Sequence, residues 1–192
     1  MKCAQKSALF IAALALATAQ RAPAFDGGAL MAMMATVRES TVAFEETKQV
    51  AALNAPLVRR GTMRYVRPDR LQMRVEQPYF ERLEIAGSQV TIENRKGRRE
   101  FDLGAVPAAA AWVESLRATL SGDATALERH YRVDVRGTAD DWTLALHPRD
   151  RTLAQRVERI DLAGSNAQIM RVTIEEPQGD RTTLVLTPKD AQ

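Results

Sequence analysis

The sequence predicts an α+β protein whose β-sheet is mainly antiparallel. Three observations lead to this fold class: an early stretch with helical spacing of apolar residues, many segments in which apolar and polar residues alternate, and a second helical stretch between two groups of such segments. The order helix, strands, two helices, strands favours one sheet with helices packed on it. Without an expected N-terminal leader, about 168 of the 192 residues remain, which suits a single domain, 25–192, with its own core.

The first 24 residues are expected to form a secretory signal peptide. Lys2 and Lys6 give a positive start, and residues 8–16 are an apolar run. Ala22-Pro23-Ala24 places small residues at a cleavage site, with a cut after Ala19 as an alternative. The run is shorter than the roughly 20 apolar residues that cross a membrane. The mature chain is therefore expected to be soluble in a bacterial periplasm, and a buried N-terminal helix is the alternative interpretation.

The net charge of +3 belongs to the expected signal peptide, which holds Lys2, Lys6 and Arg21 and no acidic residue. Without it, 27 basic and 24 acidic residues become 24 and 24, and the chain is formally neutral. A neutral chain with few aromatic residues gives no support for nucleic-acid binding. The sole cysteine, Cys3, also lies in this segment, ahead of the apolar run. Disulfides, thiol catalysis and a lipid-modified cysteine at the cleavage point are therefore not expected.

The first predicted helix covers about residues 29–39. Its apolar residues follow the i, i+3, i+4, i+7 spacing of one helix face: Leu30, Met33, Met34 and Val37. From residue 40 the apolar period changes to two, so residues 40–50, which include Phe44, are predicted to form the first strand.

The clearest alternation lies in the segment 61–78, GTMRYVRPDRLQMRVEQP, which predicts a β-hairpin. One face of its second strand carries three apolar residues: Leu71, Met73 and Val75. That face is expected to be buried, and the opposite, charged face to be wet. At the turn, Pro68 disfavours the helical region for the residue before it, so Arg67 is expected to be extended at the strand end.

Two helices are predicted between the two groups of strands. Pro107 suits the first position of a helix whose apolar face carries Trp112, Leu116 and Leu120. Asp123 is expected to cap a shorter helix that ends at His130. Alternation predicts the later strands at about 80–86, 88–95, 98–103, 131–137, 140–148, 156–163, 168–176 and 180–187.

No catalytic or metal-binding constellation is apparent in the sequence. His130 and His147 are the two histidines and lie far apart, with no cysteine nearby. Acidic residues occur as adjacent pairs: Glu45-Glu46, Asp140-Asp141 and Glu175-Glu176. Neighbours on a strand point to opposite faces, which does not suit paired acid–base catalysis. There is no glycine-rich phosphate loop. Neither enzymatic activity nor a cofactor or metal is therefore expected.

Three motifs carry a resemblance to a known family. The strongest is the segment 61–71, a glycine, an alternating strand and an Arg-Pro turn, followed by Gln77-Pro78. The others are Phe44-Glu45-Glu46-Thr47-Lys48, as a phenylalanine-containing first strand, and residues 85–90, as the turn of a later hairpin. In this order they resemble the periplasmic LolA-like carriers of outer-membrane lipoproteins, over about residues 29–186.

The resemblance implies a half-open antiparallel β-barrel of roughly eleven strands, with helices covering its concave face and an apolar cavity between. It implies a monomeric periplasmic carrier that shields the acyl chains of a lipoprotein or lipid and passes them from an inner-membrane donor to an outer-membrane acceptor. Flexible methionine side chains suit such a cavity, although methionines also simply fill gaps in cores. The expected cavity residues are Leu30, Met33, Met34, Val37, Phe44, Met63, Tyr65, Leu71, Met73, Val75, Trp112, Leu116, Trp142 and Met170.

The resemblance also implies a role for Arg67. The matching arginine of the LolA-like family acts as a latch that bonds helix carbonyls across the cavity mouth and separates the closed state from the loaded one. The guanidinium group suits this role because it has five donors in a fixed fork. A solvated arginine at a strand end is the alternative interpretation.

Two departures from the family pattern leave the cargo open between a lipoprotein and a lipid or polyene. The chain ends at Gln192, soon after the last expected strand, where the family has a further C-terminal stretch. Arg64 stands where such carriers often have tryptophan. The hairpin also holds Arg59, Arg60 and Arg74, and this basic rim suits either phosphate head groups or an ion-paired, solvated strand face. A lipid-sensing binding domain and an enzyme on the same half-barrel are alternative functions.

Overall fold

The computed structural model describes residues 25–189, except for the side chains of residues 107–109 and 112. The expected signal peptide, residues 1–24, therefore lies outside the described residues, and so does the side chain of Trp112.

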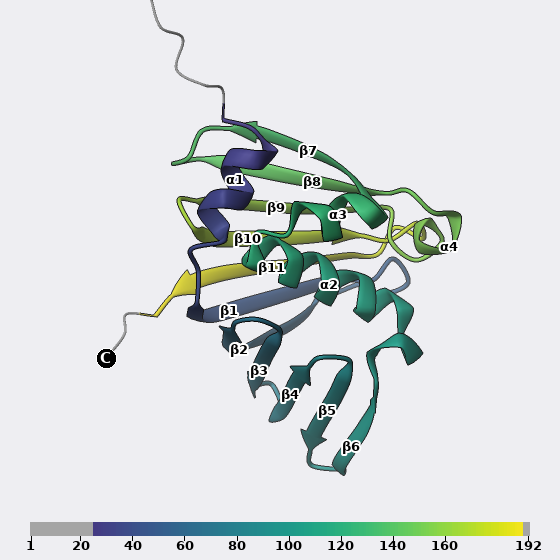
Figure 1. Ribbon diagram of the computed structural model, residues 1–192. Helices are drawn as coiled ribbons and strands as arrows, with labels where there is room; N and C mark the ends of the chain where they lie inside the picture. The colour runs from purple at the N-terminus through teal and green to yellow at the C-terminus, as the bar shows by residue number, and fades with distance from the viewer. Residues whose placement is uncertain (1–24, 190–192) are drawn as a thin grey trace, which may run out of the picture.

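Eleven strands form one antiparallel sheet that curves into a half-open barrel (Figure 1). The predicted fold class is confirmed. The order in the sheet is β6-β5-β4-β3-β2-β1-β11-β10-β9-β8-β7, so the first and last strands pair with each other in its middle, and β6 and β7 are its edges. The strands are β1 Glu39–Gln49, β2 Leu57–Val66, β3 Arg70–Gln77, β4 Glu81–Ala86, β5 Gln89–Asn94, β6 Gly97–Asp102, β7 Tyr131–Gly137, β8 Trp142–Pro148, β9 Arg159–Ser165, β10 Gln168–Glu175 and β11 Arg181–Pro188.

Helices α1, α2 and α3 lie over one face of the sheet, while β3–β6 extend beyond them (Figure 1). The helical elements are α1 Gly27–Met34, the 3₁₀ helix η1 Leu103–Ala105, α2 Pro107–Ser121, α3 Ala124–His130 and α4 Arg151–Ala154. Strand β6 leads directly into η1 and α3 leads directly into β7, so this helical stretch joins the two sheet edges. Among residues 25–189, no helix combines the length and the apolar character needed to cross a membrane.

Helix α1 starts and ends earlier than the spacing of its apolar residues predicts. Asp26 caps it by accepting a hydrogen bond from the backbone N–H of Ala29 at 2.9 Å. The helix ends at Met34, and Val37 already lies beyond it. The predicted end at residue 39 is wrong because β1 begins at Glu39, where the chain must be extended to pair with β2.

Helices α2 and α3 form where the sequence predicts them. Pro107 is in the first turn of α2, and Gly122 ends that helix in the left-handed conformation, with φ 70°. Asp123 then caps α3 by accepting a hydrogen bond from the N–H of Ala126 at 2.9 Å. Both predicted helices are confirmed. Elements η1 and α4 were not predicted, since 3 and 4 residues are too few to display a helical period.

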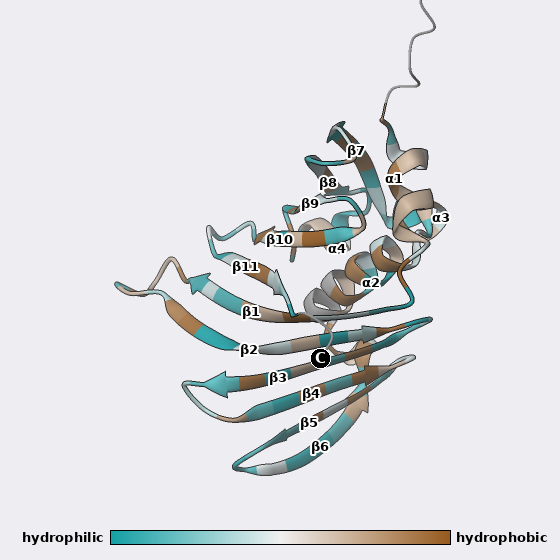
Figure 2. Cartoon of the chain, turned by 90° about the vertical axis from the view of Figure 1, so that its left-hand side faces the viewer, coloured by the Kyte–Doolittle hydropathy of each residue, from teal (hydrophilic) through white to brown (hydrophobic). Residues whose placement is uncertain are grey.

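The hydrophobic core lies between the concave face of the sheet and the helices. On β3 every second residue from Leu71 to Val75 is buried, so the predicted two-faced hairpin is confirmed. Figure 2 shows the corresponding changes between hydrophobic and hydrophilic segments along the strands. Gly61 on β2 sits where the register with β3 shifts, and a Cβ there would overlap the carbonyl oxygen of Arg74. Glycine is therefore needed at this position of the hairpin.

The expectation that Met170 lines the concave face is wrong. The register between β9 and β10 shifts between Ile169 and Arg171, which leaves Met170 as an additional residue in a bulge. Ile169 and Val172 are buried, whereas Met170 is 39% exposed. A bulge changes which residues face the core, and simple alternation does not reveal it.

Candidate functional site

Most of the expected cavity residues come together in one sealed core beneath the helices. Ten of them are at most 5% exposed: Leu30, Met34, Phe44, Met63, Tyr65, Leu71, Met73, Val75, Leu116 and Trp142. Met33 and Val37 are partly buried and pack against this core. The concave face therefore offers a continuous apolar surface, which the helices cover.

Among the described residues, one small cavity lies between α2 and the sheet. The cavity there has a volume of about 30 Å³. It is bounded by Ser40, Val42, Met63, Tyr65, Leu71, Leu116, Leu120, Ala167, Ile169 and Leu186. A cavity needs about 10–15 Å³ of such volume to hold one water, so this space is far too small for an acyl chain. At this place an acyl chain would fit only with α2 farther from the sheet.

Arg67 joins the ends of two helices at the mouth of this core. Its Nη1 donates a hydrogen bond to the carbonyl of Ala35, the C-cap of α1, and its Nη2 donates to the carbonyl of Ser121, the last residue of α2. Both bonds are 2.6 Å long. Carbonyls at helix C-termini lack partners within the helix and carry partial negative charge, which suits a cationic donor. One side chain thus connects the β2–β3 turn to α1 and α2.

Gly122 allows the two helix ends to lie close enough for this bridge. A Cβ at Gly122 would overlap the carbonyl oxygen of Met31 and would lie 2.7 Å from the Cβ of Ala35. Its φ of 70° is also a conformation that favours glycine. The contact between α1 and the end of α2 therefore depends on this glycine.

A second arginine, Arg117, ties the middle of α2 to the sheet. Its Nη1 donates to the carbonyl of Gly87 in the β4–β5 turn at 3.0 Å, and its Nη2 lies 3.5 Å from a carboxylate oxygen of Asp69 in the β2–β3 turn. Only 15% of its side chain is exposed. Sequence reasoning missed Arg117, although a basic residue directly after the buried Leu116 was a signal that could have pointed to it.

Two buried tyrosines keep their protons in this core. The Tyr65 hydroxyl donates to the carbonyl of Pro68 at 3.2 Å, and the Tyr131 hydroxyl donates to the carbonyl of Ala111 at 3.1 Å. Burial raises the pKa of Tyr65 and raises the pKa of Tyr131 to about 12. Both groups therefore act as neutral hydrogen-bond donors.

An open groove lies on the concave side at the end of the sheet opposite Arg67, where the helices do not cover the strands. This distal groove has a volume of about 680 Å³, within the usual range of ligand pockets. It is lined by Pro56, Leu57, Val58, Arg59, Val75, Pro78, Tyr79, Phe80, Glu81, Asn94, Arg95 and Lys96. Leu57 and Tyr79 are more than half exposed there. Val75 belongs to both the groove and the sealed core, so the two apolar surfaces meet.

An ion-paired cluster lies between the distal groove and the core. Arg59 donates two hydrogen bonds of 2.8 Å to the carboxylate of Glu46, which is 8% exposed, and lies 3.4 Å from Glu81. Glu46 and Arg59 are opposite each other in the register of β1 and β2, on the concave face. The apolar surface is therefore interrupted by one satisfied polar group.

The four arginines of the predicted basic rim all pair with carboxylates. The pairs are Arg59–Glu46 at 2.8 Å, Arg60–Glu45 at 2.7 Å, Arg64–Glu39 at 2.7 Å and Arg74–Glu76 at 3.6 Å. The Arg64 guanidinium also holds the pKa of Glu39 below its usual value through a side-chain hydrogen bond. Arg59 lies on the concave face, and the other three pairs favour the interpretation as an ion-paired strand face.

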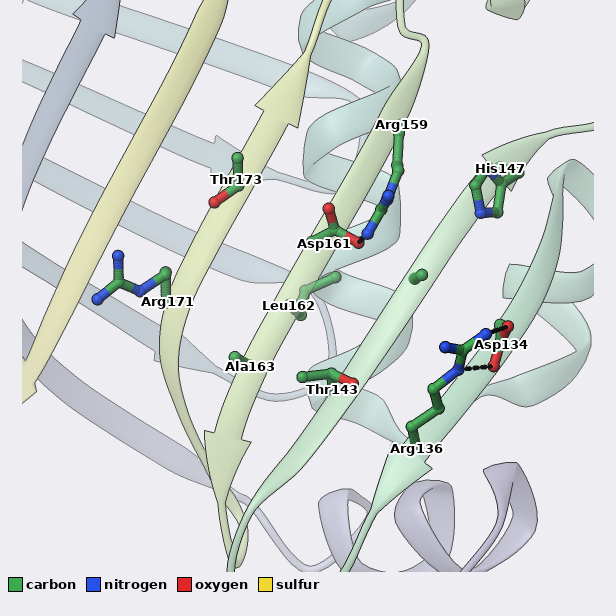
Figure 3. A pocket seen from close by; sticks show the side chains of 11 residues that line it. Asp134, Arg136, Thr143, His147, Arg159, Asp161, Leu162, Ala163, Arg171 and Thr173 are labelled. Carbon is green, nitrogen blue, oxygen red and sulfur yellow. Dashed lines mark hydrogen bonds and ion pairs between the residues drawn. The ribbon is translucent and has the colours of Figure 1, made fainter.

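A separate hollow of about 280 Å³ lies on β7–β10 and includes His147 (Figure 3). Its two carboxylates are occupied by arginines, since Arg136 donates to Asp134 at 3.0 and 3.3 Å and Arg159 donates to Asp161 at 2.7 Å. The hydrogen bond from Arg136 lowers the pKa of Asp134, so this carboxylate stays ionised. Among the described residues, no group of three or more His, Cys, Asp or Glu could hold a metal ion.

The family follows from a match along almost the whole chain. A family model described as "Outer membrane lipoprotein carrier protein LolA-like" matches residues 18–192. The chain belongs to this LolA-like family. The family resemblance seen in the sequence is thereby confirmed, and the family description is that of a carrier, a binding protein. No curated protein matches the LolA-like chain.

Several solved structures are similar to this LolA-like chain at low sequence identity. A LolA superfamily protein from Nitrosomonas europaea has a TM-score of 0.46 at 10% identity, with 88% of this chain and 96% of that chain covered. A DUF1329 family protein from Desulfovibrio piger has a TM-score of 0.48 at 10% identity, with coverages of 86% and 93%. The lipoprotein LppX from Mycobacterium tuberculosis has a TM-score of 0.42 at 8% identity, with coverages of 85% and 97%.

Proposed function

We propose that this LolA-like protein is a periplasmic carrier that shields the acyl chains of a lipoprotein or lipid. Its cargo would pass from an inner-membrane donor to an outer-membrane acceptor, and the protein would act as a monomer without a cofactor and without catalysis. The N-terminal segment 1–24, with its basic start and apolar run, supports export as a secretory signal peptide.

The observation that carries the proposal is an apolar concave face under helices whose ends are joined by one side chain, Arg67. Arg67 bonds the ends of α1 and α2 at 2.6 Å, and the described cavity beneath α2 measures only about 30 Å³. We propose that Arg67 is a latch: the bonded arrangement is the empty carrier, and cargo displaces α2 and breaks these bonds.

The energetics favour a movable cover rather than a permanently open pocket. Each methylene removed from water contributes about 0.8 kcal/mol, so a chain of about 16 carbons gains roughly 12 kcal/mol on burial. A carrier must both bind and release such a chain, and closure of the helices over the empty core offsets part of that gain. Buried methionines, among them Met34, Met63 and Met73, can repack around chains of different shape.

The proposed path of the cargo starts at the distal groove. The groove is open while the helices are closed, and Val75 connects its wall to the sealed core. The end of an acyl chain that lies in the groove would reach the core as α2 moves away. The Glu46–Arg59 pair at the boundary, in which the Arg59 side chain is 38% exposed, offers hydrogen-bonding groups to a polar part of the cargo.

The test is direct analysis of bound molecules followed by a transfer assay. The protein is purified gently from the periplasm of its own host, and extracted molecules are identified by mass spectrometry. An acylated peptide supports a lipoprotein cargo, and a free lipid or polyene ester supports a lipid cargo. Labelled cargo is then offered from donor vesicles and counted in acceptor vesicles. Binding without transfer would favour the lipid-sensing alternative, and a chain that stays empty in both assays would contradict the carrier proposal.

A further inference from the structure

The distal groove combines an exposed apolar surface with uncompensated positive charge. Leu57 is 53% exposed and Tyr79 is 67% exposed, and both line the same hollow. Exposed apolar side chains that gather around a hollow, and do not lie scattered singly, are typical of a binding site. The volume of about 680 Å³ is large enough for part of an extended hydrocarbon chain.

Two cations stand at the rim of this groove on the β5–β6 turn. Arg95 and Lys96 have no carboxylate partner among the residues that the structure describes. By contrast, Arg82 and Arg98 on the neighbouring strands pair with Glu93 and Glu100. The positive charge of the β5–β6 turn is therefore available to a ligand.

The position of Arg95 connects this charge to the apolar wall. Its guanidinium carbon lies 5.8 Å from the centre of the Tyr79 ring, within the range of a cation–π contact. That contact holds the cation beside the aromatic surface and leaves its N–H donors free for an oxygen-bearing anion. A ligand with a hydrocarbon chain against Leu57 and Tyr79 and an anionic group at the turn would satisfy both features.

We propose that the distal groove selects anionic amphiphiles, molecules with an acyl chain and a phosphate or carboxylate head group. This inference rests on the proposed carrier function, because it names the chemical class of the cargo. The head group lies at Arg95 and Lys96, and the chain runs along the groove toward Val75 and the sealed core. Selection happens while the Arg67 bridge is intact, since the groove is open in that arrangement.

The experiment compares two lipids that differ in charge. Binding of palmitoyl lysophosphatidylglycerol, which is anionic, and of palmitoyl lysophosphatidylcholine, which is zwitterionic, is measured by calorimetry below their micelle concentrations. Exposed ion pairs contribute about 0.2–1 kcal/mol each, so two cations should give the anionic lipid a roughly two- to thirtyfold advantage. The double variant Arg95→Gln/Lys96→Gln should lose this advantage. Tyr79→Ser should weaken both lipids.

The matched control is Arg82→Gln/Arg98→Gln, which removes the same net charge from the opposite face of β4 and β6. It should keep the preference for the anionic lipid. Equal binding of the two lipids by the unchanged protein overturns the inference and leaves the carrier function standing. The inference is also overturned if the control loses the preference for the anionic lipid as fully as the groove variant does. It is overturned as well if Tyr79→Ser binds the anionic lipid as strongly as the unchanged protein does. If neither lipid binds to the unchanged protein or to Arg67→Leu, the carrier proposal itself is overturned.

Discussion

Replacement of Arg67 by leucine tests the proposed latch most directly. Leucine cannot donate to the carbonyls of Ala35 and Ser121, so the bonds that join the two helix ends to the β2–β3 turn are lost. Arg67 is exposed, and its side chain does not belong to the hydrophobic core. The variant is therefore expected to fold with its sheet and core intact.

The size of the effect follows from the two bonds. A hydrogen bond to a charged group contributes about 1.5–3 kcal/mol, and solvent exposure places these two near the lower value. Together they stabilise the closed arrangement by about 3 kcal/mol. Since 1.4 kcal/mol is a factor of ten, the ratio of open to closed molecules should rise about 100-fold. The affinity for cargo should rise by up to the same factor, because the empty closed state is less stable relative to the loaded open state.

Two measurements check this expectation. Hydrogen exchange should accelerate by up to about 100-fold for the amides of α1 and α2, while the amides of β1 and β2 keep their rates. In a vesicle assay, the variant should take up acyl cargo and release it to acceptor vesicles more slowly than the unchanged protein.

The control is Arg64→Leu, the same substitution three residues earlier on β2, where the arginine pairs with Glu39. It should leave helix exchange and cargo release unchanged. Normal helix exchange together with normal cargo transfer in Arg67→Leu would refute the latch.

Three further predictions concern the surroundings of this core. Gly122→Ala should lower the melting temperature more than Gly97→Ala. Both glycines have a positive φ, but a Cβ at Gly97 meets no atom within 4 Å. Equal losses in the two variants would show that the contact between the helix ends is unimportant. Met73→Ser should lower the free energy of unfolding by about 2–5 kcal/mol in urea titrations, whereas Met170→Ser should change it by less than about 0.5 kcal/mol. The reverse order would contradict the faces of the sheet to which the two methionines are assigned. Burial raises the pKa of Tyr131 to about 12, while the unfolded side chain ionises near pH 10. The contribution of Tyr131 to the free energy of unfolding should therefore be complete below pH 10 and fall by up to about 2–3 kcal/mol as the pH rises to 12. This part of the loss should vanish in Tyr131→Phe.

The sheet could be predicted from the sequence because its strands obey simple alternation. Leu71, Met73 and Val75 show both the strand and its buried face, and the same period marks most later strands. The period of two fails at Met170, which is an additional residue in β10. The residues before and after it therefore follow alternations that are shifted by one residue. It also fails to place the end of α1, because Val37 continues the helical spacing although pairing of β1 already requires an extended chain.

The site was predictable only in part, for a different physical reason. The contact partners of Arg67 are carbonyls at the ends of two helices, and no spacing in the sequence brings them to the β2–β3 turn; the family resemblance suggested the role. Tyr79 lies in a turn, where no period applies. Its place in the wall of the distal groove can be seen only in the structure, where the turns of three hairpins meet. Lys96 looks like an ordinary surface cation until its neighbours are known.

The connection of the sheet edges through the helices has a mechanical consequence. The sheet is an arc whose two ends, β6 and β7, are joined by residues 103–130, in which the helices are separated at Val106 and at Gly122–Asp123. No long loop separates this connection from either edge strand, so we expect a large displacement of α2 to pull on β6 and, through α3, on β7. We expect a bulkier cargo to flatten the sheet about its β1–β11 centre, and the reach of residues 103–130 to limit the size of cargo that can be enclosed.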